Sequence, residues 1–194
     1  SMADEVGDGT IVEPAWHDEL LVAVPARHPL LAYKRGPPEA VLRTIAALIP
    51  DNAIVIDESI SAGRSFFPAS MGARPHDYLQ LTGGAIGQGL PVAVGAAVAC
   101  PDRKVIALQA DGSGMYTNQS LWTMAREQLD VTTILLNNGS YAILNIELMR
   151  VGVQNPGPKA LSMLDLKHPD INWAEISTGM GVPAVRVSTA EEFR

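Results

Sequence analysis

The chain has 194 residues, of which 47% are apolar, enough to build one domain with a substantial hydrophobic core. Charged residues make up only 18% of the chain and low-complexity tracts are missing, so an intrinsically disordered chain is excluded. Fourteen basic and twenty-one acidic side chains give a net charge of −7, which argues against nucleic acid and against an anionic membrane as partners.

The first 36 residues show no sustained hydrophobic period and are interrupted by Pro14, Pro25 and Pro29. We therefore predict that residues 1–36 form a linker or the tail of a preceding domain, and that residues 37–194 form the main domain. The last residues predict a truncation at the C-terminus, because a capping-box pattern over residues 188–191 starts a helix that the chain does not complete. Ser1-Met2 resembles an expression scar, so we expect a fragment of a longer polypeptide.

From residue 37 onward, apolar β-branched runs alternate with helical patterns. The expected helices cover residues 38–49, 87–100, 118–128, 141–150 and 172–181. The expected strands cover residues 53–57, 104–110, 131–137 and 183–187, and residues 151–170 are expected to form a loop. This alternation predicts the α/β class, with a parallel sheet that carries helices on both faces.

Apolar runs and cysteine content bear on the cellular location of the protein. The longest apolar run, residues 89–100, is too short to span a bilayer, and no signal segment stands at the start. The one cysteine, Cys100, excludes a disulfide framework and any metal site built from cysteines. We therefore expect a cytoplasmic protein.

Three polar turns follow the expected strands, at residues 57–61, 110–114 and 137–140. In parallel sheets, ligands bind beyond the carboxyl ends of the strands. Asp111 and Asn138 are 27 residues apart, close to the length of one strand–helix–strand unit of about 30 residues. The spacing places both side chains at one sheet edge, where hard oxygen ligands suit Mg²⁺ or Ca²⁺.

The charge pattern around these turns also favours a metal ion. Neither lysine nor arginine occurs between Lys104 and Arg126, or between Arg126 and Arg150. A diphosphate bound here would need a divalent cation to offset its charge, while Gly112 and Gly114 would let the backbone approach it closely. The alternative is an aspartate that caps a helix and an ordinary Asn-Gly turn.

These turns also carry a family resemblance. Ala110-Asp111-Gly112-Ser113 followed by Asn137-Asn138 resembles the thiamine diphosphate motif G-D-G…N-N, with Ala110 in place of the first glycine. The likeness runs from residue 37 to about 181 and includes residues 81–91 and 138–141. It resembles the C-terminal domain of the acetolactate synthase and benzoylformate decarboxylase family, closest to acetolactate synthase large-subunit-like proteins.

The resemblance implies a thiamine diphosphate and Mg²⁺ site. Asp111 and Asn138 would bind Mg²⁺ through their side chains and Ser140 through its carbonyl. The cofactor-contacting residues would be Ser61, Gly84, Ile86, Gly112, Ser113, Ser140 and Tyr141. Among them, the Gly84 carbonyl would accept a hydrogen bond from the aminopyrimidine, and Ile86 would be the apolar wedge that bends the cofactor. The alternative for Ile86 is a plain core aliphatic residue.

The resemblance also implies the reaction. An acetolactate synthase-like enzyme decarboxylates pyruvate and ligates it to a second 2-oxo acid, so the expected partner is a small 2-oxo acid. A benzoylformate decarboxylase-like lyase and a non-catalytic cofactor-binding module remain alternatives. The family's activating glutamate lies in an N-terminal domain, usually from the other subunit, so we expect no catalytic residue in these 194 residues and a homodimer or homotetramer in the full-length enzyme.

The helix after Asn138 is expected to reach the substrate. Ile143 and Glu147 are four residues apart and share a helix face, with Leu144 beside them. The resemblance places this stretch near the substrate pocket, where a benzoylformate-type enzyme would more naturally carry an aromatic residue in place of Glu147. The alternative for Glu147 is a solvated surface position.

Overall fold

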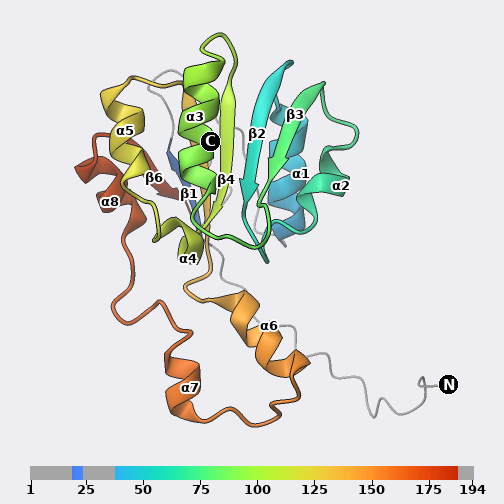
Figure 1. Ribbon diagram of the computed structural model, residues 1–194, viewed down its shortest axis with the longest axis vertical. Helices are drawn as coiled ribbons and strands as arrows, with labels where there is room; N and C mark the ends of the chain where they lie inside the picture. Colours follow the sequence, from blue (N-terminus) through green and yellow to red (C-terminus); the bar gives the residue numbers. More distant parts are fainter. Residues whose placement is uncertain (1–18, 24–37, 188–194) are drawn as a thin grey trace, which may run out of the picture.

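The computed structural model describes residues 19–23 and 38–187 (Figure 1). The strands are β1 (Glu19–Ala23), β2 (Ala53–Glu58), β3 (His76–Gln80), β4 (Val105–Ala110), β5 (Val131–Asn137) and β6 (Ala184–Val187). The helices are α1 (Pro38–Leu48), α2 (Phe66–Ser70), α3 (Gly89–Ala99), α4 (Asp111–Gly114), α5 (Ser120–Arg126), α6 (Ala142–Arg150), α7 (Pro158–Ser162) and α8 (Trp173–Gly179).

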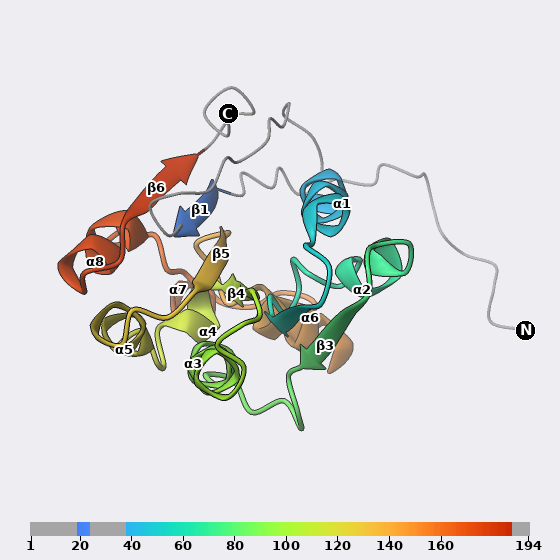
Figure 2. The same cartoon turned by 90° about the horizontal axis from the view of Figure 1, so that it is seen from above.

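The six strands form one sheet in the order β3-β2-β4-β5-β1-β6. The four strands β3, β2, β4 and β5 pair in parallel, as the strand–helix alternation predicts. Helices cover both faces of the sheet, as the view along the strands shows (Figure 2). The predicted α/β class is confirmed.

The N-terminal strand β1 differs from the prediction of a linker or tail over residues 1–36. It lies between β5 and β6 and runs antiparallel to both, so Leu21 is opposite Leu135 on one side and Arg186 on the other. The strand at residues 19–23 was therefore not expected from the sequence, which had no strand before residue 53. A five-residue strand that joins a sheet through distant partners leaves only a weak local pattern, which the flanking prolines obscure.

Two hydrophobic layers enclose the sheet because successive strand side chains alternate between its faces. On one face, α1 and α2 pack through Leu42, Ile45 and Phe66 on sheet residues such as Val55 and Leu108. On the other face, a second layer lies under α3 and α5 and a smaller one under α8; these contain Ile54, Val105, Ala107, Leu90, Met124, Leu135 and Trp173. Strands β2 and β4 are buried along nearly their whole length, as expected for parallel strands covered on both sides.

Four short elements were not expected from the sequence, namely α2, β3, α4 and α7. Each has four or five residues, too few for a hydrophobic period to show. One of them, α7, interrupts the expected loop at residues 151–170. The capping-box pattern at residues 188–191 lies outside the described residues.

The carboxyl ends of β2, β4 and β5 lie at the same edge of the sheet, and α4 begins directly after β4 (Figure 1). The segment that carries α6 and α7 projects from this edge, away from the sheet and its covering helices (Figure 1). None of the helices in the described residues is both long and apolar enough to cross a membrane.

Candidate functional site

The centre of the candidate site is Asp111, the first residue after β4. Its side chain is only 1% exposed, and its Oδ2 accepts a hydrogen bond of 2.8 Å from the N–H of Gly139, which follows β5. The same N–H also reaches Oδ1 of Asn137 at 3.0 Å. The structure therefore joins the ends of β4 and β5 at the edge that the 27-residue spacing predicted.

The ionisation of Asp111 depends on two opposing influences. Burial raises the pKa of this carboxyl above its ordinary value, because the charged form loses its hydration. Hydrogen bonds from the backbone N–H groups of Gly112 and Gly139 act in the other direction but do not cancel the effect of burial. An ionised carboxylate at this position would therefore gain from a nearby cation.

Asn138 and Ser140 lie in the turn after β5. Oδ1 of Asn138 accepts from the N–H of Ser140 at 3.0 Å, so the side chain folds over its own turn. The Ser140 hydroxyl and the Tyr141 N–H both donate to the carbonyl of Leu164, at 3.1 and 2.9 Å. The segment after α7 therefore fixes the turn from outside.

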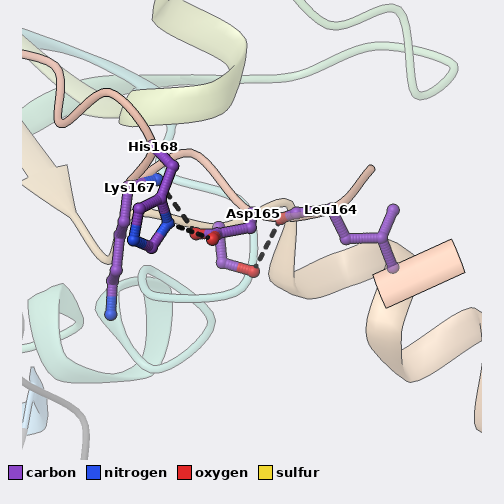
Figure 3. A network of polar contacts seen from close by, with 5 residues as sticks. Leu164, Asp165, Lys167 and His168 are labelled. Atoms are coloured by element: carbon purple, nitrogen blue, oxygen red, sulfur yellow. Dashed lines mark hydrogen bonds and ion pairs between the residues drawn. The ribbon is translucent and has the colours of Figure 1, made fainter. Parts of the chain in front are cut away.

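A network of polar contacts continues along that outer segment (Figure 3). Asp165 accepts from the Lys167 N–H at 2.9 Å, and its Oδ2 lies 2.8 Å from Nδ1 of His168. The side chain of Lys167 lies against Gly139, which has a φ of +63° and whose added Cβ would come within 2.6 Å of the lysine chain. Gly139 therefore allows both the turn and the close approach of this segment.

Gly112 and Ser113 sit at the start of α4. A Cβ added to Gly112 would lie 2.8 Å from the ring of Tyr141, so glycine permits the ring to pack on this backbone. The hydroxyl of Ser113 is buried and accepts from Nε2 of Gln109 at 2.6 Å. Burial, together with the neighbouring Tyr116 and Asp111, raises the pKa of Tyr141.

Ser61 belongs to the turn after β2, at the same edge of the sheet. Asp57 shapes the start of this turn by accepting from the Ser59 N–H at 2.9 Å, from the Ser59 hydroxyl, and from the Tyr78 hydroxyl at 2.5 Å. Burial and the contact with Asp57 raise the pKa of Tyr78. Ile60 takes a φ of +52°, which turns the chain just before the partly exposed Ser61.

Gly84 and Ile86 lie in the glycine-rich turn before α3. Gly83 and Gly84 have φ values of +62° and +68°, and the Gly84 carbonyl accepts from the Ile86 N–H at 3.0 Å. Ile86 is 38% exposed, which contradicts the alternative that it is a core aliphatic residue. An exposed aliphatic side chain at this edge is available to a ligand.

Sequence reasoning missed two residues beneath these turns, Glu58 and Gln109. Both are almost completely buried, and Glu58 accepts hydrogen bonds from the N–H groups of Gly87 and Gly89. The free N–H groups at the start of α3 are thus occupied by a protein carboxylate and are not available to a ligand. The only sequence signal was an acidic residue at the end of an apolar strand.

The expected substrate residues lie on α6. Ile143 is partly buried, and Leu144 is 46% exposed. Oε1 of Glu147 accepts from Nη1 of Arg150 at 2.8 Å on the helix surface. The three side chains share the segment that leaves the sheet edge next to Tyr141.

The donor set at this edge fits a hard divalent cation. Within the described residues, no group of three or more His, Cys, Asp or Glu side chains comes together, so a cation would rely on one carboxylate and neutral oxygens. Asp111 supplies that carboxylate, and the Asn138 amide and the Ser140 carbonyl lie in the turn that contacts it. The backbone of Gly112 lies beside them and offers a close approach to a phosphate.

A family model for the C-terminal TPP-binding domain of thiamine pyrophosphate enzymes matches residues 64–194. The chain belongs to this family. The match includes both turns that surround Asp111 and also α6. The resemblance of the motif around Asp111 and Asn138 is therefore confirmed at the level of the family.

Individual relatives support the same family assignment. The chain is 50% identical, over its whole length, to "Putative acetolactate synthase large subunit IlvX" of Mycobacterium tuberculosis, and 37% identical, over 86% of its length, to benzoylformate decarboxylase of Pseudomonas aeruginosa. The solved structure of a thiamine diphosphate-dependent 4-hydroxybenzoylformate decarboxylase from Rhodococcus jostii matches 87% of the chain with a TM-score of 0.68 and 34% identity. The chain spans 36%, 31% and 31% of the lengths of these three proteins.

Proposed function

We propose that this TPP-binding domain is part of a thiamine diphosphate-dependent, acetolactate synthase-like enzyme that acts on 2-oxo acids. The observation that carries the proposal is the buried carboxylate of Asp111 in contact with the Asn138 turn. The 50% identity with an acetolactate synthase-like protein favours that branch, while the decarboxylase relatives keep the lyase as a second candidate.

Each residue at the sheet edge has a part in this proposal. Asp111, Asn138 and the carbonyl of Ser140 would bind Mg²⁺, which offsets the charge of a diphosphate. When bound, thiamine diphosphate would supply both a nucleophilic carbon for the 2-oxo group and a cationic ring that can take up the electron pair left by CO₂. This chain would bind and orient the cofactor through the residues Ser61, Gly84, Ile86, Gly112, Ser113 and Tyr141.

The geometry indicates how two of these residues would act on the cofactor. Because the Ser113 hydroxyl already bonds to Gln109, the backbone N–H of Ser113 is the group we assign to the diphosphate, whereas the N–H of Gly112 already bonds to Asp111. The Gly84 carbonyl has a second lone pair beyond its bond to the Ile86 N–H, and that lone pair would accept from the aminopyrimidine.

We assign the remaining parts of the enzyme to a longer polypeptide. The activating glutamate would come from an N-terminal domain of a second subunit in a homodimer or homotetramer, in the cytoplasm. The 194 residues alone should therefore bind the cofactor weakly and release no CO₂. Robust decarboxylation by these residues alone would contradict this part of the proposal.

The proposed Mg²⁺ site is tested by calorimetry of Mg²⁺ and thiamine diphosphate with the full-length protein. Asp111→Ala and Asn138→Ala should abolish Mg²⁺-dependent cofactor binding and leave the fold intact. Asp130→Asn is the matched control, because Asp130 precedes β5 at the opposite end of the strand and pairs with Lys104. Unchanged affinity in Asp111→Ala would refute the site, and binding without CO₂ release from pyruvate or benzoylformate would indicate a non-catalytic module.

The proposed substrate preference rests on α6. Ile143, Leu144 and Glu147 would line the pocket, and the absence of an aromatic side chain at position 147 favours pyruvate over benzoylformate. Ile143→Ala and Glu147→Phe in the full-length enzyme should change the ratio of kcat/KM for the two substrates, because specificity is differential binding of transition states. If both variants keep the kcat/KM ratio of the parental enzyme, Glu147 only pairs with Arg150 on the helix surface.

A further inference from the structure

Glu58 is a buried carboxylate whose hydrogen-bond capacity is filled from within the described residues. Its Oε1 accepts from the N–H of Gly87 at 2.5 Å and of Gln88 at 3.3 Å. Its Oε2 accepts from the N–H of Gly89 at 2.8 Å and from Nε2 of Gln109 at 3.0 Å. All four donors are neutral, and three of them are backbone N–H groups at or just before the first residue of the eleven-residue helix α3.

These bonds fix the end of the turn that precedes α3. Gly84 and Ile86 lie immediately before Gly87, in a segment where Gly83, Gly84 and Gly87 all have positive φ. Most of this segment is exposed. The N–H of Leu81, just before it, donates to the Asp57 carbonyl at 3.1 Å, and at its other end the N–H of Gly87 donates to the Glu58 carboxylate. The end of the turn next to Ile86 is therefore held by a residue at the end of β2.

Gln109 connects the same carboxylate to the second turn. Its Nε2 donates to Glu58 and, at 2.6 Å, to the hydroxyl of Ser113, which also lies 3.3 Å from the carbonyl of Glu58. Gln109 is completely buried, and its Oε1 has no hydrogen-bond partner among the described residues. Burying Gln109 with an unpaired Oε1 costs free energy of folding, and the side chain provides a direct contact between the two turns.

Glycine at position 89 is what allows the cluster to close. A Cβ at this position would lie 2.7 Å from Oε1 of Gln109 and 2.7 Å from both Cβ and Oε2 of Glu58. Because all three atoms belong to buried side chains, none of them is free to move aside.

We infer that Glu58 and Gln109 are positioning residues that hold the turn carrying Gly84 and Ile86 in a fixed place relative to the turn carrying Gly112 and Ser113. The inference rests on the proposed function, in which the first turn contacts the aminopyrimidine and the second the diphosphate. Glu58 and Gln109 thus set the distance between the two ends of the cofactor site without touching the cofactor.

The first test needs no cofactor and uses amide hydrogen exchange in the 194-residue chain. Glu58→Gln places an amide donor against the N–H groups, so exchange at Gly87 and Gly89 should rise at least tenfold relative to core amides. Gln109→Met is the milder variant, because methionine keeps the side-chain volume and leaves the bonds of Glu58 to the backbone in place. It should raise hydrogen exchange in the Ser113 turn more than at Gly87. Met124→Ala is the control, because it removes buried volume on α5 but none of the hydrogen bonds of Glu58 or Gln109, and it should raise exchange without selecting the two turns.

The second test compares two ligands in the full-length protein, each with Mg²⁺. Glu58→Gln should weaken the binding of thiamine diphosphate at least tenfold and that of inorganic pyrophosphate less than threefold. The reason is that only thiamine diphosphate contacts the Gly84 turn in the proposed function. Gly89→Ala should show the same difference if Glu58→Gln does not fold. An equal effect on both ligands, or exchange that rises uniformly, would overturn the inference. Failure of the parental protein to bind thiamine diphosphate would reject the proposed function instead, while the exchange measurement still tests the positioning of the turn.

Discussion

Two buried carboxylates lie at the ends of neighbouring strands, and their surroundings differ: Glu58 is the last residue of β2, and Asp111 directly follows β4. Both side chains are 1% exposed. Glu58 accepts from four neutral donors, three of them at the start of a helix. The hydrogen bonds to Asp111 leave its pKa raised by burial.

Under the proposed function, the difference separates a carboxylate whose partners all come from the protein from one that would also need a ligand. A buried carboxylate is tolerated when hydrogen bonds replace its hydration, and Glu58 accepts four of them. At Asp111 the hydrogen bonds do not cancel the effect of burial on the pKa, so a bound cation would stabilise the ionised form. This is the ground on which we propose Asp111, and not Glu58, as the metal ligand.

The largest effect that separates the two residues should come from replacing each by leucine. Glu58→Leu leaves four donors without an acceptor and should lower the free energy of unfolding by about 3–5 kcal/mol. Asp111→Leu should cost clearly less, because it removes an unfavourable charge. Urea denaturation of both variants measures the difference, and equal losses would mean that the two carboxylates serve the same structural purpose.

The next effect concerns stabilisation by the ligand. Mg²⁺ and thiamine diphosphate at about 100 times their Kd should raise the stability of the full-length protein by about 2.7 kcal/mol. Asp111→Asn should lose this increase, because the amide cannot offset the cation's charge. Thermal unfolding with and without the ligands measures it, with Asp130→Asn as the control that keeps it. An unchanged ligand effect in Asp111→Asn would contradict the comparison.

A smaller effect is the pH dependence of the unliganded chain. Because the pKa of Asp111 is raised in the folded state above its ordinary value of 3.8, the folded chain binds this proton more tightly than the unfolded chain. Stability is therefore lost as the pH rises from about 3.8 through the folded pKa. Asp111→Asn should be more stable than the parent at pH 7, and the two should converge at low pH. Denaturation midpoints across this range test the sign.

The smallest effect comes from an exposed carboxylate, Asp165, which serves as the reference for the two buried ones. The hydrogen bond with His168 lowers the pKa of Asp165. Its contribution to stability is therefore present above pH 3.8 and is lost as the pH falls through the folded pKa. Asp165→Asn should change the unfolding midpoint only slightly at pH 7 and not at all at low pH. An NMR titration of the carboxyl should show the lowered pKa directly.

The comparison also shows what the sequence could reveal. Asp111 and Asn138 were predictable because their spacing matches one strand–helix–strand unit, and the parallel pairing of β4 and β5 depends on the same regularity. The partners of Glu58 were not predictable, because its donors lie 29 to 51 residues further along the chain and three of them are backbone groups. The residue types showed a polar turn but not which groups meet beneath it.

The position of β1 was also not predictable, because its partners in the sheet lie far away along the chain. This distance has a consequence for how the sheet is completed. Among the residues that the structure describes, β6 pairs with β1 alone, so its pairing requires Leu20 and Val187, more than 160 positions apart, to meet. Such a distant contact is expected to form late in folding. Until it does, β5 presents an unpaired edge to any other extended strand, and a second chain could occupy it. The short strand at residues 19–23 is therefore the part of this domain that protects its growing sheet from self-association.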